Sequence, residues 1–295
     1  MTKKILGLFL ATALISTTAG AQNKEFKKLA SGLEYKFIVD KPGQKLAVPE
    51  SQITMHIRTT ANDSTLFDSY KMNDNQPVPA QVTKPSYAGD VMEGISMMSE
   101  GDSAIFRAPA ELIFKNNQYP PFVKEGDKVQ FQVKMISVKT KEEFEADQRA
   151  AMSKQLAAED PEIKKYIKDK KLNVKQTASG LYYVITKEGD GAKAQAGQMV
   201  SMNYTGTLLD GTAFDSNVDP KFNHVSPFEF KLGVGQVIKG WDEGIALLST
   251  GGKAVLIIPS PLAYGPRSMP GNPNNPKGIP ANSPLVFEVE MLGAK

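Results

Sequence analysis

Two adjacent carboxylates, Asp242 and Glu243, follow the only tryptophan of the chain, Trp241, in the stretch VIKGWDEG (237–244). A pair of carboxylates could perform the general acid–base chemistry of a hydrolase. Neighbouring side chains at a helix start point in different directions, however, and the helix dipole favours negative charge in a first turn. We therefore expect a structural role for this pair and do not expect a hydrolase.

The residue inventory also argues against thiol, metal and nucleic-acid chemistry. The chain of 295 residues has no cysteine, which excludes disulfides, cysteine nucleophiles and cysteine metal sites. The two histidines, His56 and His224, have no partner at a metal-ligand spacing. The net charge is +3 at pH 7, and no basic stripe is interleaved with aromatic residues. We expect no cofactor, no metal and no nucleic-acid partner.

The sequence around Trp241 predicts a short helix that begins near Gly240. Ile238, Trp241, Ile245 and Leu248 recur at three- and four-residue spacing, so they form one apolar face. Trp241 is then on the buried side of this helix, and the two carboxylates are in its first turn.

The rest of this region predicts strands that must position the helix. Val200, Met202 and Tyr204 alternate with polar residues, and Asp210-Gly211 is a hairpin-turn signal. A sheet with one short helix packed against it is an α+β unit.

This α+β unit occurs twice in the chain. Four segments of the first half are similar to four segments of the second half, in the same order and about 150 residues apart. The pairs are SGLEYKFI (31–38) with SGLYYVIT (179–186), ITMHIRTTANDSTLFDS (53–69) with VSMNYTGTLLDGTAFDS (200–216), EGISMMSEGDSAIFRAP (93–109) with EGIALLSTGGKAVLIIP (243–259), and VQFQVKMISV (129–138) with LVFEVEMLGA (285–294). We expect two copies of one fold, at 31–140 and 177–295.

A helical linker is expected between the copies, at 141–176. Its segment 141–171 is charged, glycine-free and rich in helix formers, and Asp160-Pro161 predicts that one helix stops and a second starts. The apolar content is low, which favours a solvated connector. A docking or dimerisation surface, and hence a homodimer, is the alternative.

The N-terminus has the three parts of a secretory signal peptide. Lys3 and Lys4 precede an apolar run at 5–15, and Ala19-Gly20-Ala21 fits a cleavage site. The run is short for a membrane span, and no cysteine is present for lipid attachment. We expect cleavage of 1–21, no stable membrane span afterwards, and a periplasmic or secreted protein. A retained interfacial anchor is the alternative.

Four motifs of the second copy point to a known family. They are VSMNYTGTLLDGTAFDS (200–216), PFEFKLGVGQVIKGWDEGI (227–245), PLAYG (261–265) and GIPANSPLVFEVEML (278–292). Together they resemble the FKBP-type peptidyl-prolyl cis-trans isomerases over about 180–295. The resemblance implies a twisted antiparallel sheet that wraps a short helix. The proline side chain of the substrate peptide inserts between the sheet and the helix.

The resemblance also implies the site residues. Trp241 matches the pocket floor, on which the proline ring rests, and Ile279 matches the loop that overhangs it. For catalysis, Asp215 matches a wall carboxylate, while the Tyr264 hydroxyl and the Ile238 backbone N–H match the groups that bind substrate carbonyls. The other matched positions of the pocket lining are Tyr204, Phe214, Phe228, Val237 and Phe287, with Phe230 in the core beside them.

Such a pocket suits the chemistry of amide rotation. The barrier about an X-Pro bond is about 18–20 kcal/mol, and no bond to a nucleophile or metal is needed to lower it. A catalyst must bind the twisted amide better than either planar form. The twisted amide is less polar, so a dry aromatic pocket with one or two hydrogen-bond donors favours it.

The first copy lacks several of these groups. Phe67-Asp68 keeps the phenylalanine–aspartate pair, and Phe131 corresponds to Phe287. The replacements are Ile57 for Tyr204, Val91 for Trp241 and Phe114 for Tyr264. We expect this copy to keep the fold and to have little or no catalytic activity.

The combined prediction is an exported peptidyl-prolyl isomerase that assists folding of proline-containing polypeptide clients. On family grounds, macrolides of the tacrolimus or rapamycin type are expected to bind the second copy. The loops 217–225 and 265–278 have their own length and composition, which predicts altered substrate choice. A non-catalytic chaperone or peptide-binding module is the alternative.

Overall fold

The computed structural model describes residues 25–114 and 118–295. The signal peptide expected at 1–21 lies outside the described residues. The chain divides into two compact units, and the boundary between them in the sequence lies between Ala146 and Asp147. Each unit contains one seven-stranded antiparallel sheet and few helices.

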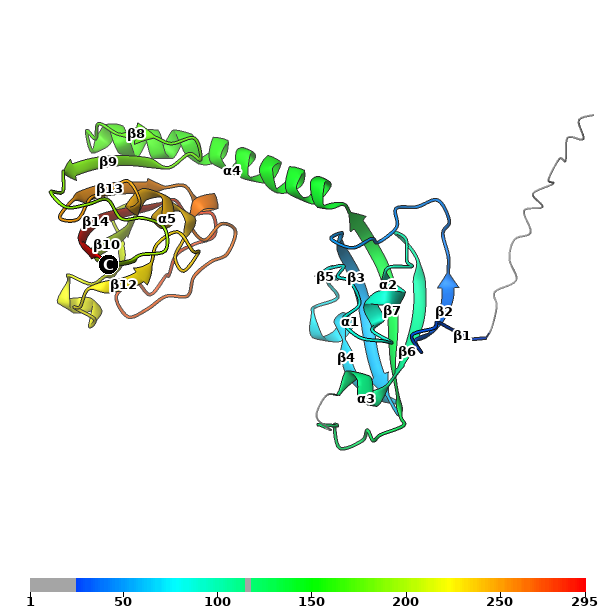
Figure 1. Cartoon of the computed structure of the whole chain (residues 1–295). Helices are drawn as coiled ribbons and strands as arrows, with labels where there is room; N and C mark the ends of the chain where they lie inside the picture. The colour runs from blue at the N-terminus through cyan, green and yellow to red at the C-terminus, as the bar shows by residue number, and fades with distance from the viewer. Residues whose placement is uncertain (1–24, 115–117) are drawn as a thin grey trace, which may run out of the picture. The chain divides into compact units, whose positions relative to one another are not determined.

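The sheet of the second unit forms the framework of the predicted site. Its strands follow the order β8-β9-β13-β14-β10-β11, and a seventh strand, β12, also pairs with β10 (Figure 1). Their bounds are Lys175–Gln176 (β8), Tyr182–Lys187 (β9), Lys253–Ile258 (β13), Leu285–Ala294 (β14), Met199–Leu208 (β10), Ala213–Ser216 (β11) and Phe228–Lys231 (β12). The register places Gly206 opposite both Phe287 and Asp215.

The first unit repeats this arrangement strand by strand. Its order is β1-β2-β6-β7-β3-β4, with β5 paired to β3. The strands are Lys27–Lys28 (β1), Glu34–Val39 (β2), Ser103–Pro109 (β6), Lys128–Lys139 (β7), Gln52–Ala61 (β3), Ser64–Asp68 (β4) and Val78–Gln81 (β5). Its helices are α1 (Ser69–Met72), α2 (Val91–Ile95) and α3 (Ala110–Ile113). Two copies of one α+β fold are therefore confirmed.

The helix expected near Gly240 is α5 (Lys239–Ile245). Glycine lets it approach the sheet closely, because a Cβ on Gly240 would lie 2.4 Å from Ile258 Cγ2 and one on Gly244 would lie 2.7 Å from Leu256 Cδ1. The 3₁₀ segments η2 (Pro220–Phe222) and η3 (Ser260–Leu262) flank the same region. Helix and sheet thus form one core around Trp241.

The linker forms a single helix, α4 (Lys141–Asp169), which runs through Pro161. The prediction of two helices is wrong, because Asp160 does not cap a new helix. Its carboxylate instead accepts a hydrogen bond from the Tyr182 hydroxyl at 2.6 Å and pairs with Lys164 at 2.7 Å.

The part of α4 in the second unit lies beside β8 and β9 (Figure 1). Ile163 is 1% exposed and packs with Tyr182, Ile257 and Val286. This part of the helix is therefore anchored on the sheet and is not a solvated connector. Among the described residues, no helix is both long and apolar enough to cross a membrane.

Candidate active site

An open cavity of about 990 Å³ lies in the second unit, between α5, the sheet and the segment that follows η3. Nine of the ten predicted site residues line it. They are Tyr204, Phe214, Asp215, Phe228, Val237, Ile238, Trp241, Tyr264 and Phe287. These nine residues come from six separate stretches of the sequence and converge on one hollow.

Trp241 and Phe287 are the most enclosed aromatic side chains that line this cavity. Trp241 is 4% exposed, and its ring centroid lies 5.1 Å from that of Phe287 and 5.2 Å from that of Tyr204, both edge to face. Phe230, 3% exposed, supports it from the core at 5.9 Å. The indole Nε1 has no hydrogen-bond partner within the described chain. This floor is apolar and closely packed, as a proline ring requires.

A carboxylate stands in the wall beside this floor. Asp215 Oδ2 accepts a hydrogen bond from the Tyr204 hydroxyl at 2.6 Å, and Oδ1 accepts one from the Ser216 N–H at 2.9 Å. Burial, and then the bond to Asp215, raise the pKa of Tyr204 above its ordinary value. Tyr204 therefore stays protonated at neutral pH and keeps the carboxylate in place.

Two hydrogen-bond donors remain available to a bound ligand. Burial, and then the charge of Asp215, raise the pKa of Tyr264, so its hydroxyl keeps its proton at neutral pH. Neither this hydroxyl nor the backbone N–H of Ile238 donates to another described residue. Ile238 directly precedes α5, where backbone N–H groups are left without helical partners. The cavity therefore combines an aromatic floor with two free donors.

Ile279 is the one predicted site residue that does not line the cavity. It is 6% exposed within the core and exchanges two backbone hydrogen bonds with Met269, at 2.8 and 3.1 Å. Its role in an overhanging loop stays a prediction.

The carboxylates after Trp241 have structural contacts. Asp242 accepts hydrogen bonds from the N–H groups of Gly233 and Gly235, at 2.8 and 2.9 Å, and so fixes the turn before α5. Glu243 accepts one from the Ser179 hydroxyl at 2.6 Å. Neither residue lines the cavity. The two carboxylates thus act separately, as the sequence predicted.

Sequence reasoning missed two residues of this site. His224 Nε2 lies 2.7 Å from Asp215 Oδ1, although the loop around His224 carries no pattern that would indicate the contact. Gln148 of α4 lines the cavity from a segment that was expected to be a linker. Both could be found only from the fold, because each is brought to the site by a loop or a helix outside the motifs.

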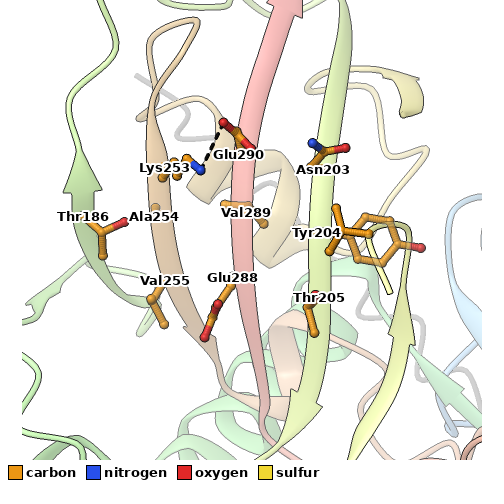
Figure 2. Close-up of a pocket in the computed structure, with 11 residues that line it drawn as sticks. Thr186, Asn203, Tyr204, Thr205, Lys253, Ala254, Val255, Glu288, Val289 and Glu290 are labelled. Carbon is orange, nitrogen blue, oxygen red and sulfur yellow. Dashed lines mark ion pairs between the residues drawn. The ribbon is translucent and has the colours of Figure 1, made fainter. Parts of the chain in front are cut away.

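A second hollow, of about 370 Å³, lies on the outer face of the same sheet (Figure 2). There Glu288 and Glu290 point outward from β14 on either side of Val289, and Glu290 pairs with Lys253 at 3.2 Å. This lining mixes apolar side chains with carboxylates and the Lys253–Glu290 ion pair, and it has no enclosed aromatic floor such as Trp241, so it does not suit a proline ring. Among residues 25–114 and 118–295, no group of three or more His, Cys, Asp or Glu could hold a metal ion.

In the first unit, other side chains occupy the positions that correspond to Tyr204, Trp241 and Tyr264. Ile57, Val91 and Phe114 are partly buried and pack against the core of that unit. Asp68 accepts a hydrogen bond from the Tyr70 N–H at 3.0 Å and lies 3.7 Å from Arg58. The first unit thus keeps the carboxylate but lacks the indole and the hydroxyls.

Comparisons with known proteins agree with this geometry. The profile of the family "FKBP-type peptidyl-prolyl cis-trans isomerase" matches residues 43–136 and 190–292, one stretch in each unit. "FK506-binding protein 1" of Saccharomyces cerevisiae is 55% identical over 105 residues, which are 35% of this chain and 83% of that protein. "FKBP-type peptidyl-prolyl cis-trans isomerase FkpA" of Aeromonas hydrophila is 47% identical over 123 residues, which are 42% of this chain and 41% of that protein.

Among solved structures, FkpA from Escherichia coli is 38% identical, over 50% of this chain and 64% of that one, with a TM-score of 0.39. The family match covers most of the chain and falls on both repeats of the fold. The chain belongs to the FKBP-type peptidyl-prolyl cis-trans isomerases, with two copies of the family's domain in tandem.

Proposed function

We propose that isomerisation takes place in the cavity of the second unit, on the floor formed by Trp241. The observation that carries this proposal is the convergence of nine predicted residues around one apolar hollow with two free donors. The proline ring rests on the indole, and water is kept from the amide by the aromatic wall. The Ile238 N–H and the Tyr264 hydroxyl bind the carbonyl groups of the peptide as the amide twists.

The wall carboxylate acts on the same step by electrostatics and by packing. Asp215 is held by the Tyr204 hydroxyl, and His224 lies against its second oxygen. A fixed carboxylate needs no rearrangement when the amide loses its planarity, and such preorganisation stabilises a transition state. Lowering the barrier by about 5–8 kcal/mol corresponds to roughly 10⁴–10⁶-fold in rate.

The clients of this enzyme are exported polypeptides that contain proline. The support is the signal-peptide pattern at 1–21, which predicts a periplasmic or secreted protein. The cavity is also wide enough for a larger apolar ligand. Because relatives are named FK506-binding proteins, we extend the proposal to macrolides of that type.

The first unit binds or holds polypeptide without catalysing isomerisation. Its core is complete, but Val91 and Phe114 stand where the second unit has the indole and the hydroxyl. A chaperone-like contribution of this unit is compatible with an isomerase in the second.

An isomerisation assay on a proline-containing peptide tests the assignment of the site. We expect Tyr264→Phe and Asp215→Ala each to lower kcat/KM about tenfold or more, since each removes one hydrogen-bonding group. The matched control is Asp68→Ala, which removes the equivalent carboxylate of the first unit and should leave kcat/KM unchanged. Wild-type rates in both second-unit variants, with preserved suppression of aggregation, would instead favour a non-catalytic chaperone.

A further inference from the structure

A buried carboxylate of α4 contacts the segment that carries Tyr264. Glu159 is 3% exposed, and its Oε2 accepts a hydrogen bond from the Ser260 N–H at 2.7 Å. Its Oε1 accepts bonds from the Ser260 hydroxyl and from Gln155 Nε2, the latter at 2.6 Å. A carboxylate is costly to bury unless its oxygens are hydrogen-bonded, so this cluster requires Ser260 to stay in place.

Ser260 in turn organises the wall of the cavity. Its carbonyl accepts hydrogen bonds from the N–H groups of Ala263 and Gly265, at 2.9 and 2.8 Å. These two residues flank Tyr264, and residues 261 and 263–265 all line the cavity. Glu159 therefore contacts Ser260, and Ser260 holds the turn that positions the Tyr264 hydroxyl.

The same helix also reaches the cavity directly. Gln148 belongs to the cavity lining and precedes Glu159 by eleven positions on α4. At 1.5 Å per residue, that is about 16 Å along the helix axis. Helix α4 thus contacts the site at two points. Gln148 lines the cavity, and Glu159 bonds the segment that carries Tyr264.

We infer that Glu159 is a positioning residue for isomerisation, which holds Ser260 so that the turn at 261–265 keeps Tyr264 directed at the substrate. This inference rests on the proposed catalytic role of the second-unit cavity. Without the carboxylate, the Ser260 N–H is buried without a partner and the turn is free to shift. A shift of about 1 Å at a reacting group can cost 10²-fold in rate.

The first test compares three variants of the full chain in the proline-peptide assay, at a temperature well below the midpoint of unfolding. We expect Glu159→Ala to lower kcat/KM at least about tenfold, mainly through kcat, with an unchanged circular dichroism spectrum. Glu159→Gln should stay within about threefold of wild type, since the amide can still bond both Ser260 groups. The matched control, Tyr182→Phe, removes the neighbouring bond to Asp160 and should keep the wild-type kcat/KM.

A purely structural role gives a different result. If Glu159→Ala lowers the midpoint of unfolding but keeps the wild-type kcat/KM, as Tyr182→Phe does, the inference is wrong. If Glu159→Ala does not fold, Glu159→Met replaces it, because methionine fills a similar volume and removes both contacts to Ser260. A fall in kcat of that variant supports the inference, and an unchanged kcat overturns it.

Combining Glu159→Ala with Tyr264→Phe separates this inference from the proposed role of the hydroxyl. If Glu159 acts through Tyr264, the double variant loses less than the product of the two single losses. If Tyr264→Phe is impaired and the losses multiply, the inference is wrong. A wild-type rate in Tyr264→Phe alone would contradict the role of the hydroxyl, and the inference is then judged by the kcat of Glu159→Ala.

Discussion

Trp241 shows why a large apolar side chain stands next to two carboxylates. The indole faces the cavity and the core, while Asp242 and Glu243 bond the turn before α5 and Ser179. Three consecutive residues of one short helix thus contact three different parts of the unit: the cavity, the turn before α5 and Ser179. The ring contributes both to folding and to the proposed binding of proline.

Replacing this indole tests both contributions. We expect Trp241→Ala to lower the free energy of unfolding of the second unit by about 3–5 kcal/mol, because a large buried side chain leaves a cavity. In molecules that remain folded, kcat/KM for a proline peptide should fall at least tenfold, since the proline ring loses its floor. Urea unfolding and the peptide assay measure the two effects. Trp241→Phe, which keeps a ring, should show smaller losses, and equal losses in both variants would contradict the floor role.

The pocket residues could be predicted because they belong to motifs of the sequence. Phe214-Asp215, Val237-Ile238 and Tyr264-Gly265 each stand in a local pattern, and the fold brings these patterns together. His224 could not be found in this way. It meets Asp215 only because the loop 217–225 folds back on β11, and loop geometry is not encoded in a local spacing.

Helix α4 shows where local signals fail. Asp160-Pro161 has the composition of a helix start, but packing against the sheet outweighs that preference. Tyr182 supplies a partner for the Asp160 carboxylate, and Ile163 supplies apolar burial on the next turn. The short helix α5 was predictable because its apolar period and its glycines agree with its tertiary contacts.

The contact between α4 and β9 should make the second unit sensitive to alkaline pH. Burial, and then the bond to Asp160, raise the pKa of Tyr182 from 10.0 to about 12. The folded state therefore keeps this proton over a range in which the unfolded state loses it, and the free energy of unfolding falls as pH rises from about 10 to 12.

Tyr182→Phe tests this pH dependence. Urea unfolding of the full chain at several values in that range should show a shallower fall for the variant than for wild type. The fall is reduced and not abolished, because the raised pKa values of Tyr204 and Tyr264 contribute in the same direction. An identical slope in both proteins would contradict the coupling of Tyr182 to folding.

At the scale of the whole molecule, two units share one strand order but differ in the groups that fill the site. The repeat was visible in the sequence because strand positions kept similar residues in both copies. The second compact unit begins at Asp147 and so includes most of α4. A fragment that starts after this helix would lack Gln148 and Glu159.

Separate fragments test how activity is divided between the units. We expect residues 147–295 to keep the kcat/KM of the full chain on a short proline peptide, and residues 25–146 to show none. A fragment of residues 172–295 is the informative third protein, and its kcat should be lower because Ser260 has lost Glu159. Activity of 25–146 comparable to that of 147–295 would refute the assignment of catalysis to the second unit.

The single tryptophan makes the cavity of the second unit readable by fluorescence. The chain contains one indole chromophore, and it stands at the floor of the cavity. Its emission therefore reports on this cavity alone, with no contribution from the other copy of the domain. A ligand that settles on the ring should change that emission directly, so the natural protein carries its own optical titration probe.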